Sequence, residues 1–504
     1  MKSVPAIRIR DANHAPVRAS GQYILYWMIA SRRLTHNFAL DRALEYSREL
    51  QRPLLILEPL RCGYHWASDR IHQFVIDGMA DNAATAKRHS IAYYPYLEPS
   101  AGAGKGLLKA LAAEACVIVT DEFPCFFLPH MVGAAAKQLN LKLETVDSNG
   151  LLPIRATDHA FPTAHAFRRF LQKNLPAHLS DWPAANPLVN AGGARGAVVP
   201  RKILQRWPRV SFKHLRGGSV PLAGFPIDHS VHPCAPRGGH FAADSALINF
   251  LENKFRNYGE HRNEPELDAT SGLSPYLHFG HISVHEAFEK LVRLEKWKPE
   301  KISLRANGSR EGWWNMSSTA ESFLDELITW REVGYNFTSH RDDHDKFESL
   351  PEWARKTLKI HARDERKYLY KLDQFESANT HDPLWNAAQI QLVREGRIHN
   401  YLRMLWGKKI LEWSKAPQAA AEIMIHLNNK YALDGRNPNS YTGIFWVLGR
   451  YDRPWGPERP IFGTIRYMSS ENTARKLGVK TYVQRYSPGL PTRPELVKKS
   501  AFPG

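Results

Sequence analysis

The hydrophobic pattern of this chain changes part-way along its length. Up to about residue 155, short and almost fully apolar runs alternate with stretches of helical periodicity. The apolar runs lie at residues 23–30, 54–60, 91–97, 115–120 and 141–147, and residues 38–51 form an amphipathic helix. Apolar strands separated by helices are typical of a parallel sheet that is covered on both faces. The pattern therefore predicts an α/β domain with a Rossmann-like parallel sheet.

A stretch rich in Pro, Gly and Ala follows, from about residue 180 to residue 240, and breaks both periodicities. Beyond it the strand signals vanish and helical ones dominate. A chain of 504 residues is also too long for one compact core. We expect an α/β domain over residues 20–178, a linker wrapped over the surface at 179–240, and an all-α domain over 241–490.

Three helices in the second half have predictable ends. The first has Asp382 as its N-cap, Pro383 as its first residue and Gly396 as its C-terminal stop. The second is expected from about His399 to Pro417. The third begins at Pro417 and ends in the turn-rich segment DGRNPNSYTG.

The chain is basic, with 68 Lys and Arg against 50 Asp and Glu and a net charge of +18. This balance favours a polyanionic partner such as nucleic acid, although a basic surface that binds nothing accounts for the charge equally well. Four cysteines without metal-ligand spacing indicate a reduced compartment and no metal site. The N-terminus shows no secretion signal, and residues 23–30 are too few to span a membrane.

Two stretches invite a comparison with phosphate-binding loops. GAGKG at residues 102–106 lacks the Ser or Thr that must follow the Gly-Lys pair, so we interpret it as a flexible loop. TSGLS at residues 270–274 supplies hydroxyls and backbone N–H groups just before an expected helix, which suits a phosphate. An ordinary capped loop is the alternative there.

The octapeptide WGKKILEW places Trp406 and Trp413 two helical turns apart, so their rings lie on one face about 10 Å apart. Trp385 on the preceding helix could pack against that face. Ordinary core packing is one interpretation. The other is a relay of redox-active indoles from a buried cofactor to the surface. Lys408 and Lys409 lie off the tryptophan stripe and are expected to be solvated.

Glu326 and Trp330 stand at helical positions i and i+4, which places a carboxyl and an indole on the same face. A surface acid beside a packed tryptophan is one interpretation. A carboxyl among aromatic walls would instead be desolvated and tend to keep its proton, which makes it a hydrogen-bond donor.

Several longer motifs resemble the class II cyclobutane pyrimidine dimer photolyases, and the resemblance spans residues 20–485. The motifs are YILYWMIASRRLTHNFAL, SGLSPYLHFGHIS, THDPLWNAAQ, NYLRMLWGKKILEW, LNNKYALDGRNPNSYTGIFW, YDRPWG and FGTIRYMS. The resemblance implies the photolyase/cryptochrome fold, with an α/β antenna domain and an all-α FAD-binding domain. It also implies light-driven repair of cyclobutane pyrimidine dimers in UV-damaged DNA by electron transfer from excited, reduced FAD.

The resemblance assigns each matching residue a role. Residues that would hold the FAD phosphates and ribityl chain are Tyr258, Thr270, Ser271, Gly272, Leu273 and Ser274. Arg403 and Asp434 would pair beside the flavin ring, and Asn428 would face its N5 atom. Glu326 would hydrogen-bond the damaged bases. Residues that would form the dimer pocket are Trp330, Tyr401, Met404 and Trp446, and those near the DNA strands are Arg262, Arg453, Trp455 and Arg466.

The indole relay would run from Trp406, nearest the flavin, through Trp385 to Trp413, the outermost, with Tyr370 as a side branch. Its role in the family is photoreduction of oxidised FAD. A second, antenna chromophore of deazaflavin or folate type is left open by the sequence, which carries no motif for either. We expect a monomer in the cytoplasm, or in the nucleus of a eukaryote.

Two other functions compete with repair. A cryptochrome-like photoreceptor would share the fold, FAD and the tryptophan relay but would signal to protein partners. Such receptors often carry long C-terminal extensions, whereas about twenty residues follow YVQRY here. A flavin-free nucleic-acid-binding protein would leave the helical half's cofactor-sized constellation of residues unexplained.

Overall fold

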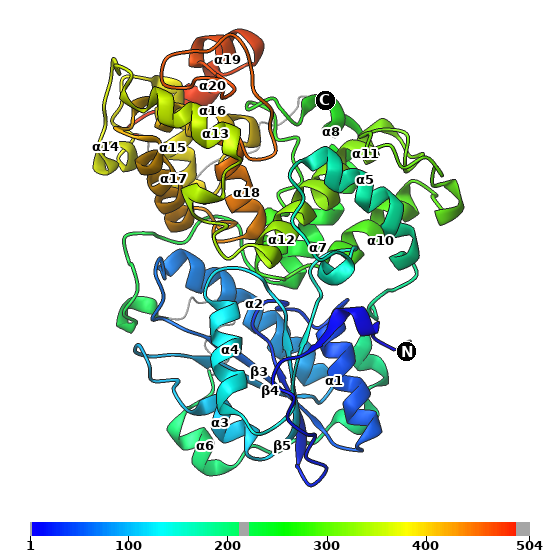
Figure 1. Cartoon of the computed structure of the whole chain (residues 1–504). Helices are drawn as coiled ribbons and strands as arrows, with labels where there is room; N and C mark the ends of the chain where they lie inside the picture. The colour runs from blue at the N-terminus through cyan, green and yellow to red at the C-terminus, as the bar shows by residue number, and fades with distance from the viewer. Residues whose placement is uncertain (1–2, 211–220, 490–504) are drawn as a thin grey trace, which may run out of the picture.

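A computed structural model describes residues 3–210 and 221–489 of the chain. Its described residues form a six-stranded sheet in the order β1-β6-β5-β2-β3-β4, in the lower half of Figure 1. The strands are β1 (Ile9–Asp11), β2 (Tyr23–Trp27), β3 (Leu54–Leu60), β4 (Ala92–Leu97), β5 (Ala115–Asp121) and β6 (Leu143–Val146). Neighbouring strands are parallel, except that β1 pairs antiparallel with β6 and sets Ile9 opposite Val146.

The alternation of side chains along β2 explains why the sheet is covered on both faces. Tyr23, Leu25 and Trp27 pack in one cluster with α3 (Leu107–Ala112) and α4 (Leu128–Gln138). Ile24 and Tyr26 point the other way and pack with α1 (Phe38–Glu49). The helix α2 (Asp69–Arg88) adds its apolar face beside β3 and β4. Successive strand residues face opposite sides, so a strand that is apolar throughout must be buried twice.

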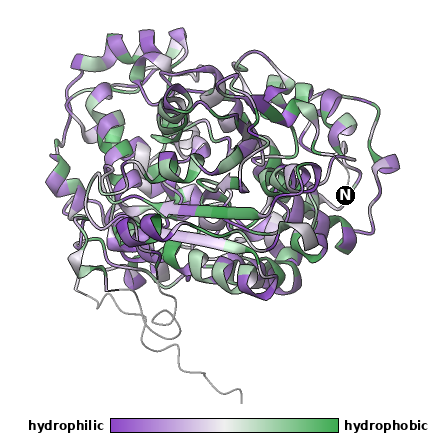
Figure 2. Ribbon diagram, turned by 90° about the horizontal axis from the view of Figure 1, so that it is seen from below, coloured by the Kyte–Doolittle hydropathy of each residue, from purple (hydrophilic) through white to green (hydrophobic). Residues whose placement is uncertain are grey.

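Helices account for nearly all the regular structure after β6, and in Figure 1 all of those labelled except α6 lie above the sheet, in two groups. One group contains α5 (Ala164–Asn174), α7 (His240–Asn249), α8 (Phe255–His261), α9 (Ser274–His278), α10 (Val284–Leu294), α11 (Ser318–Leu324) and α12 (Arg331–His340). The other contains α13 (Glu352–Ile360), α14 (Leu372–Glu376), α15 (Pro383–Glu395), α16 (Asn400–Trp413), α17 (Pro417–Tyr431), α18 (Pro438–Val447), α19 (Ser470–Lys476) and α20 (Lys480–Arg485). Each group has its own hydrophobic core. Figure 2 shows hydrophilic and hydrophobic colours alternating along the outlying helices, as expected for helices with one face on a core.

The described part of the expected linker packs on the sheet domain. Its helix α6 (Arg201–Arg206) lies against α3. Trp207 is buried, and its Nε1 donates to the carbonyl of Ala103 over 2.9 Å. Further along, Asp228 bridges to Ser68 at the start of α2. The expectation of a segment wrapped over the surface fits these contacts, while the domain limits at residues 178 and 240 stay predictions.

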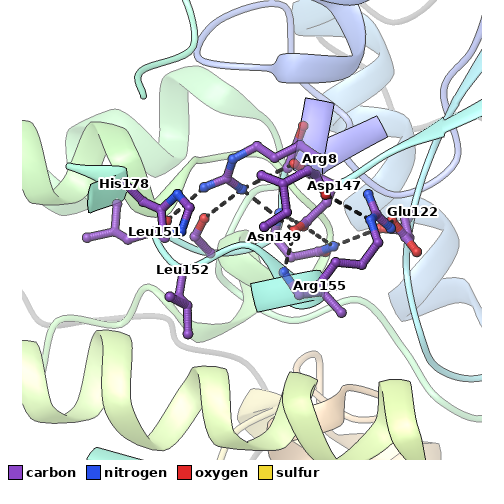
Figure 3. A network of polar contacts seen from close by, with 12 residues as sticks. Arg8, Glu122, Asp147, Asn149, Leu151, Leu152, Arg155 and His178 are labelled. Carbon is purple, nitrogen blue, oxygen red and sulfur yellow. Dashed lines mark hydrogen bonds and ion pairs between the residues drawn. The ribbon is translucent and has the colours of Figure 1, made fainter. Parts of the chain in front are cut away.

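A buried polar network joins the edge of the sheet to the helical part (Figure 3). The Arg8 guanidinium is fully buried and donates to the carbonyls of Gly150 and Leu151 over 3.2 and 2.7 Å. It also lies 3.6 Å from Asp147. Glu332 on α12 accepts the backbone N–H of Leu151 over 2.7 Å. Sheet and helical part are therefore held together by buried hydrogen bonds as well as by apolar packing.

The helix ends follow the sequence closely. The Asp382 side chain accepts the N–H of Trp385 over 3.0 Å, and Gly396 closes α15 with φ of 67°. The second helix ends at Trp413, before Pro417, where the third begins. The predicted strands are confirmed, and β1 is a strand that the sequence did not predict, because three residues carry no periodicity. Within the described ranges, every helix is too short or too polar to cross a bilayer.

Candidate active site

A cavity of about 1140 Å³ lies in the helical part and gathers residues from widely separated segments. Its walls come from α8, the segment before α9, the turn between α11 and α12, the start of α16, and α18. The predicted site residues that line it are Tyr258, Arg262, Thr270, Ser271, Gly272, Leu273, Ser274, Glu326, Trp330, Tyr401, Arg403, Met404, Asp434, Trp446 and Arg466. Asn428, Arg453 and Trp455 adjoin these residues, whereas the four aromatic residues of the expected relay are not part of the lining.

The ion pair expected between Arg403 and Asp434 is present. Arg403 Nη2 lies 3.3 and 3.4 Å from the two oxygens of Asp434, and its Nη1 lies 3.4 Å from Oδ1 of Asn428. Asn428 is buried and donates from Nδ2 to Ser440 Oγ over 2.6 Å. The amide is thereby oriented by two partners, one of which, Ser440, the sequence had not indicated.

The segment 270–274 suits an anionic ligand. Thr270, Ser271 and Ser274 bring three hydroxyls to the cavity wall. Gly272 has φ of 68°, and a side chain built there would meet no atom within 4 Å. The backbone therefore has room for a ligand to approach closely, which a left-handed glycine permits at no steric cost. Tyr258 also lines the cavity, and burial raises the pKa of its phenol.

Glu326 differs from its expected environment. Residues Asp325–Trp330 form a π-helical turn between α11 and α12, a geometry frequent at functional sites. The side chain of Glu326 is 33% exposed and is ion-paired with Arg262, Oε1 to Nη1, over 2.5 Å. The structure therefore does not show the expected desolvated carboxyl. The Arg262 guanidinium, at the C-terminal end of α8, contacts the carboxylate where aromatic side chains were predicted to surround it. This ion pair raises the pKa of Arg262.

An alternating stack of cations and indoles borders the cavity. Lys408 Nζ lies 5.3 Å from the Trp446 ring, Arg466 lies 5.4 Å from the same ring and 4.0 Å from Trp455, and Arg453 lies 4.6 Å from Trp455. One carboxylate holds the stack: Asp452 accepts from Arg466 Nε over 2.9 Å and from Trp455 Nε1 over 3.1 Å. Sequence reasoning missed Asp452, although it directly precedes Arg453.

The three relay tryptophans are brought together, all at most 2% exposed. The rings of Trp385 and Trp413 lie 6.0 Å apart, and Trp385 Nε1 donates to the Trp406 carbonyl over 3.0 Å. Trp406 Nε1 donates to Oε1 of Gln389 over 2.9 Å. Gln389 was missed, yet its place four residues after Trp385 could have indicated it. Trp413 is buried rather than at the surface, because Tyr370 packs over it at 5.7 Å.

The expectation that Lys408 and Lys409 are solvated is wrong. Lys408 is fully buried and donates to the Val447 carbonyl over 2.5 Å, at the end of α18. Burial lowers its pKa to about 7. Lys409 is 6% exposed, ion-pairs with Glu412 over 2.8 Å and lies 5.4 Å from the Trp413 ring. The face of α16 that carries the two lysines is covered by α18 and by Tyr467. The periodicity of α16 alone cannot show that other elements pack on this face.

A second cavity of about 650 Å³ lies at the sheet domain and is mainly aromatic and apolar. Trp27, Tyr64, Phe123 and Phe126 line it, together with the 102–106 loop. Glu98 accepts the N–H groups of Gly102 and Gly104, each over 3.1 Å. The loop is thus pinned by a carboxylate rather than free, and its amides are taken. His278 lines both cavities.

The described residues contain no group of three or more His, Cys, Asp or Glu side chains placed to hold a metal ion. The polar groups of the first cavity include hydroxyls, guanidiniums, amides, imidazoles, one lysine and carboxylates. Such a set suits an organic ligand with phosphates.

Comparisons with known proteins agree with this description. The chain is 34% identical over 483 residues to a deoxyribodipyrimidine photo-lyase of Methanothermobacter thermautotrophicus, covering 96% of this chain and 98% of the relative. Proteins of the same name from Potorous tridactylus and Arabidopsis thaliana are 31% and 32% identical, covering 93% and 91% of this chain and 82% and 88% of the relatives.

A search against protein-family models found no match. Among solved structures, a bacterial class III photolyase from Agrobacterium tumefaciens superposes with a TM-score of 0.62 at 16% identity, covering 92% of this chain and 86% of that one. This likeness bears on the fold alone. The relatives' identity over nearly their whole length, together with the fold, shows that the chain belongs to the photolyase/cryptochrome family, among the deoxyribodipyrimidine photo-lyases.

Proposed function

We propose that this protein is a class II deoxyribodipyrimidine photo-lyase, which uses light and FAD to repair cyclobutane pyrimidine dimers in UV-damaged DNA. The observation that carries the proposal is the convergence of Glu326, Trp330, Tyr401, Met404 and Trp446 on the cavity that the 270–274 segment also lines. One cavity thereby offers a cofactor end and a substrate end. The class assignment rests on the sequence motifs.

The residues present fit FAD. The cavity of about 1140 Å³ is large enough for a dinucleotide, and the Thr270, Ser271 and Ser274 hydroxyls with the open backbone at Gly272 suit its phosphates. Arg403, Asp434 and Asn428 would bind the flavin ring, with a charge on one side and an amide on the other. Reduced FAD supplies, when excited by light, the electron that opens the cyclobutane ring and that the ring later returns.

The substrate end requires a partner exchange at Glu326. The carboxylate is held by Arg262 over 2.5 Å in this structure, and both side chains line the cavity. A dimer entering the cavity would offer base N–H groups to Glu326 and a phosphate to Arg262, so each group of the ion pair would gain a substrate contact. Trp330 and Trp446 would then hold the bases by stacking, since flipped bases are bound between aromatic and apolar side chains.

The cationic rim would bind the DNA backbone. Arg466 and Arg453 flank Trp455, which would fill the gap left by the flipped dimer. The net charge of +18 adds long-range attraction to a polyanion. We propose a monomer that acts where the genome is held, in the cytoplasm or, in a eukaryote, the nucleus.

The second cavity would bind an antenna chromophore of deazaflavin or folate type. Its aromatic lining, Trp27, Phe123 and Phe126 among others, suits a planar ring, and Arg32 and Lys105 supply positive charge. His278, which lines both cavities, sets the two ligands close together.

Repair of an oligonucleotide that contains one thymine dimer tests the proposal. With chemically reduced flavin, illumination should restore the thymine absorbance and darkness should not. Glu326→Ala should lower the repair rate by about tenfold or more, whereas Glu252→Ala, an exposed acid outside the cavity, should not. Mass spectrometry of the extracted chromophores identifies both ligands. If dimers survive illumination with the flavin fully reduced, the photoreceptor function replaces repair.

A further inference from the structure

A tyrosine and a histidine close the outer end of the tryptophan relay. The Tyr370 ring lies 5.7 Å from Trp413, and its backbone N–H donates to the Trp413 carbonyl over 3.0 Å. The His381 ring lies 4.9 Å from Trp413. The Tyr370 hydroxyl and Nδ1 of His381 are 2.8 Å apart. Three oxidisable or basic rings are thus in mutual contact between the buried indoles and solvent.

The hydrogen bonds around the Tyr370 hydroxyl leave its own hydrogen available to His381. The Tyr370 oxygen accepts the backbone N–H of His381 over 3.0 Å, so its own hydrogen is free to point at Nδ1. The two ring planes are nearly parallel, with an interplanar angle of 17° and centroids 6.0 Å apart. Tyr368 stacks on His381 with centroids 3.6 Å apart and fixes the imidazole plane. At 2.8 Å, Nδ1 of a neutral imidazole can accept the phenolic hydrogen.

The surroundings favour moving a positive charge off Trp413. The Lys409 ammonium lies 5.4 Å from the centroid of the Trp413 ring and would repel a positive charge on that indole. Glu412, which is ion-paired with Lys409, offsets part of this repulsion. Packing by the neighbouring rings lowers the pKa of His381, whose outer edge is exposed. The lowered pKa favours the neutral imidazole, which is able to take up a proton.

We propose that His381 is the base that accepts the phenolic proton of Tyr370 when Tyr370 is oxidised by Trp413, which makes this pair the terminal electron donor of the relay. The inference rests on the proposed function. Trp413 is first oxidised to a radical cation, because its electron passes through Trp385 and Trp406 to photoexcited, oxidised FAD. One electron then moves from Tyr370 to Trp413 while the phenolic O–H bond breaks and an N–H bond forms at Nδ1.

The products are a neutral Trp413, a neutral tyrosyl radical and an imidazolium. A thiol reductant in solution later returns one electron to Tyr370, and His381 returns the proton. The imidazolium now carries the positive charge next to solvent. The electron on the flavin can therefore return along the tryptophans to Tyr370 only if the proton also moves back from His381. The pair thus lengthens the time available for reductant to act.

Flash photolysis of the holoenzyme with oxidised FAD tests the step. In the wild type the tryptophan radical signal should convert to that of a tyrosyl radical, more slowly in D₂O. His381→Gln keeps a hydrogen-bond acceptor without a basic nitrogen and should slow this conversion at least about tenfold. Tyr370→Phe should abolish the tyrosyl signal. His130→Gln, an exposed histidine on α4, is the matched control and should leave the kinetics unchanged.

Nitrogen-15 NMR of the histidine side chains gives a readout without light. Nδ1 of His381 should carry no hydrogen in the wild type, and its resonance should move in Tyr370→Phe; a protonated Nδ1 overturns the proposal. Equal tyrosyl formation rates in the wild type and His381→Gln also overturn it, while the proposed function stands. Wild-type protein that binds no flavin or forms no tryptophan radical overturns both.

Discussion

Lys408 is a charged side chain in a place that excludes water. It is fully buried beside the Trp446 ring and satisfies the last carbonyl of α18, an end where a cation is favoured by the helix dipole. Because Trp446 lines the cavity, this lysine supports the substrate end from behind. Burial removes water from the Lys408 ammonium group, and this desolvation lowers the pKa of Lys408 to about 7.

This lowered pKa predicts how stability depends on pH. Between about pH 7 and the ordinary lysine range, the unfolded chain binds a proton at Lys408 that the folded chain has released. The free energy of unfolding should therefore rise with pH there, by at most about 1.4 kcal/mol per unit. Lys408→Met should remove this rise. Urea unfolding of both proteins from pH 7 to pH 9 measures the difference, and parallel curves would contradict the assignment.

The pair α15 and α16 carries the three tryptophans of the proposed relay. Asp382 and Gly396 define the length of α15, and that length brings Trp385 between Trp406 and Trp413. The two tryptophans of α16 are connected through a residue of another helix, not directly along their own. The spacing within WGKKILEW is therefore necessary for the relay but not sufficient.

Trp385→Phe tests this element. Phenylalanine keeps most of the ring volume but cannot be oxidised by the neighbouring indole, so photoreduction of oxidised FAD should slow by at least about tenfold. Repair by chemically reduced enzyme should persist. Trp297→Phe, a buried tryptophan in the other helical core, is the control and should leave photoreduction intact. Joint loss of photoreduction and repair in Trp385→Phe would contradict the separate role of the relay.

At the scale of the whole molecule, the junction between sheet and helical part sets the position of the site. Arg8 at the sheet edge binds the segment of residues 147–152 (Figure 3). Glu332 on α12 accepts a hydrogen bond from the same segment. The chain of α12 continues directly from the turn that carries Glu326 and Trp330. A shift at this junction would be transmitted to the cavity wall.

Arg8→Met measures what the junction contributes. The variant leaves Asp147 and two carbonyls without their buried partner, so the free energy of unfolding should fall by roughly 3 kcal/mol. Arg10→Met, two residues along the same edge and 57% exposed, is the matched control and should change it by about 0.5 kcal/mol or less. Urea midpoints give both values, and equal midpoints would assign the stability of the junction to apolar packing alone.

The predictable features share a physical basis in local periodicity. The strands β2 to β6 and the ends of α15 follow from apolar runs and capping residues, because these depend on neighbours a few positions away. The site residues could be matched through motifs, and the structure gathers most of them on one cavity. The strand β1 was not predicted, because its three residues form a strand only through pairing with β6, more than 130 positions away in the sequence.

By itself, the sequence determined the α/β order of the first part, the helical second part and the tryptophan spacing. Only the tertiary structure decided that Arg262 neutralises Glu326, that Lys408 and Lys409 are buried, and that His381 meets Tyr370 beside Trp413. The reason is physical: periodicity describes one element and its buried face, whereas the environment of a charge is set by whatever other element packs against it.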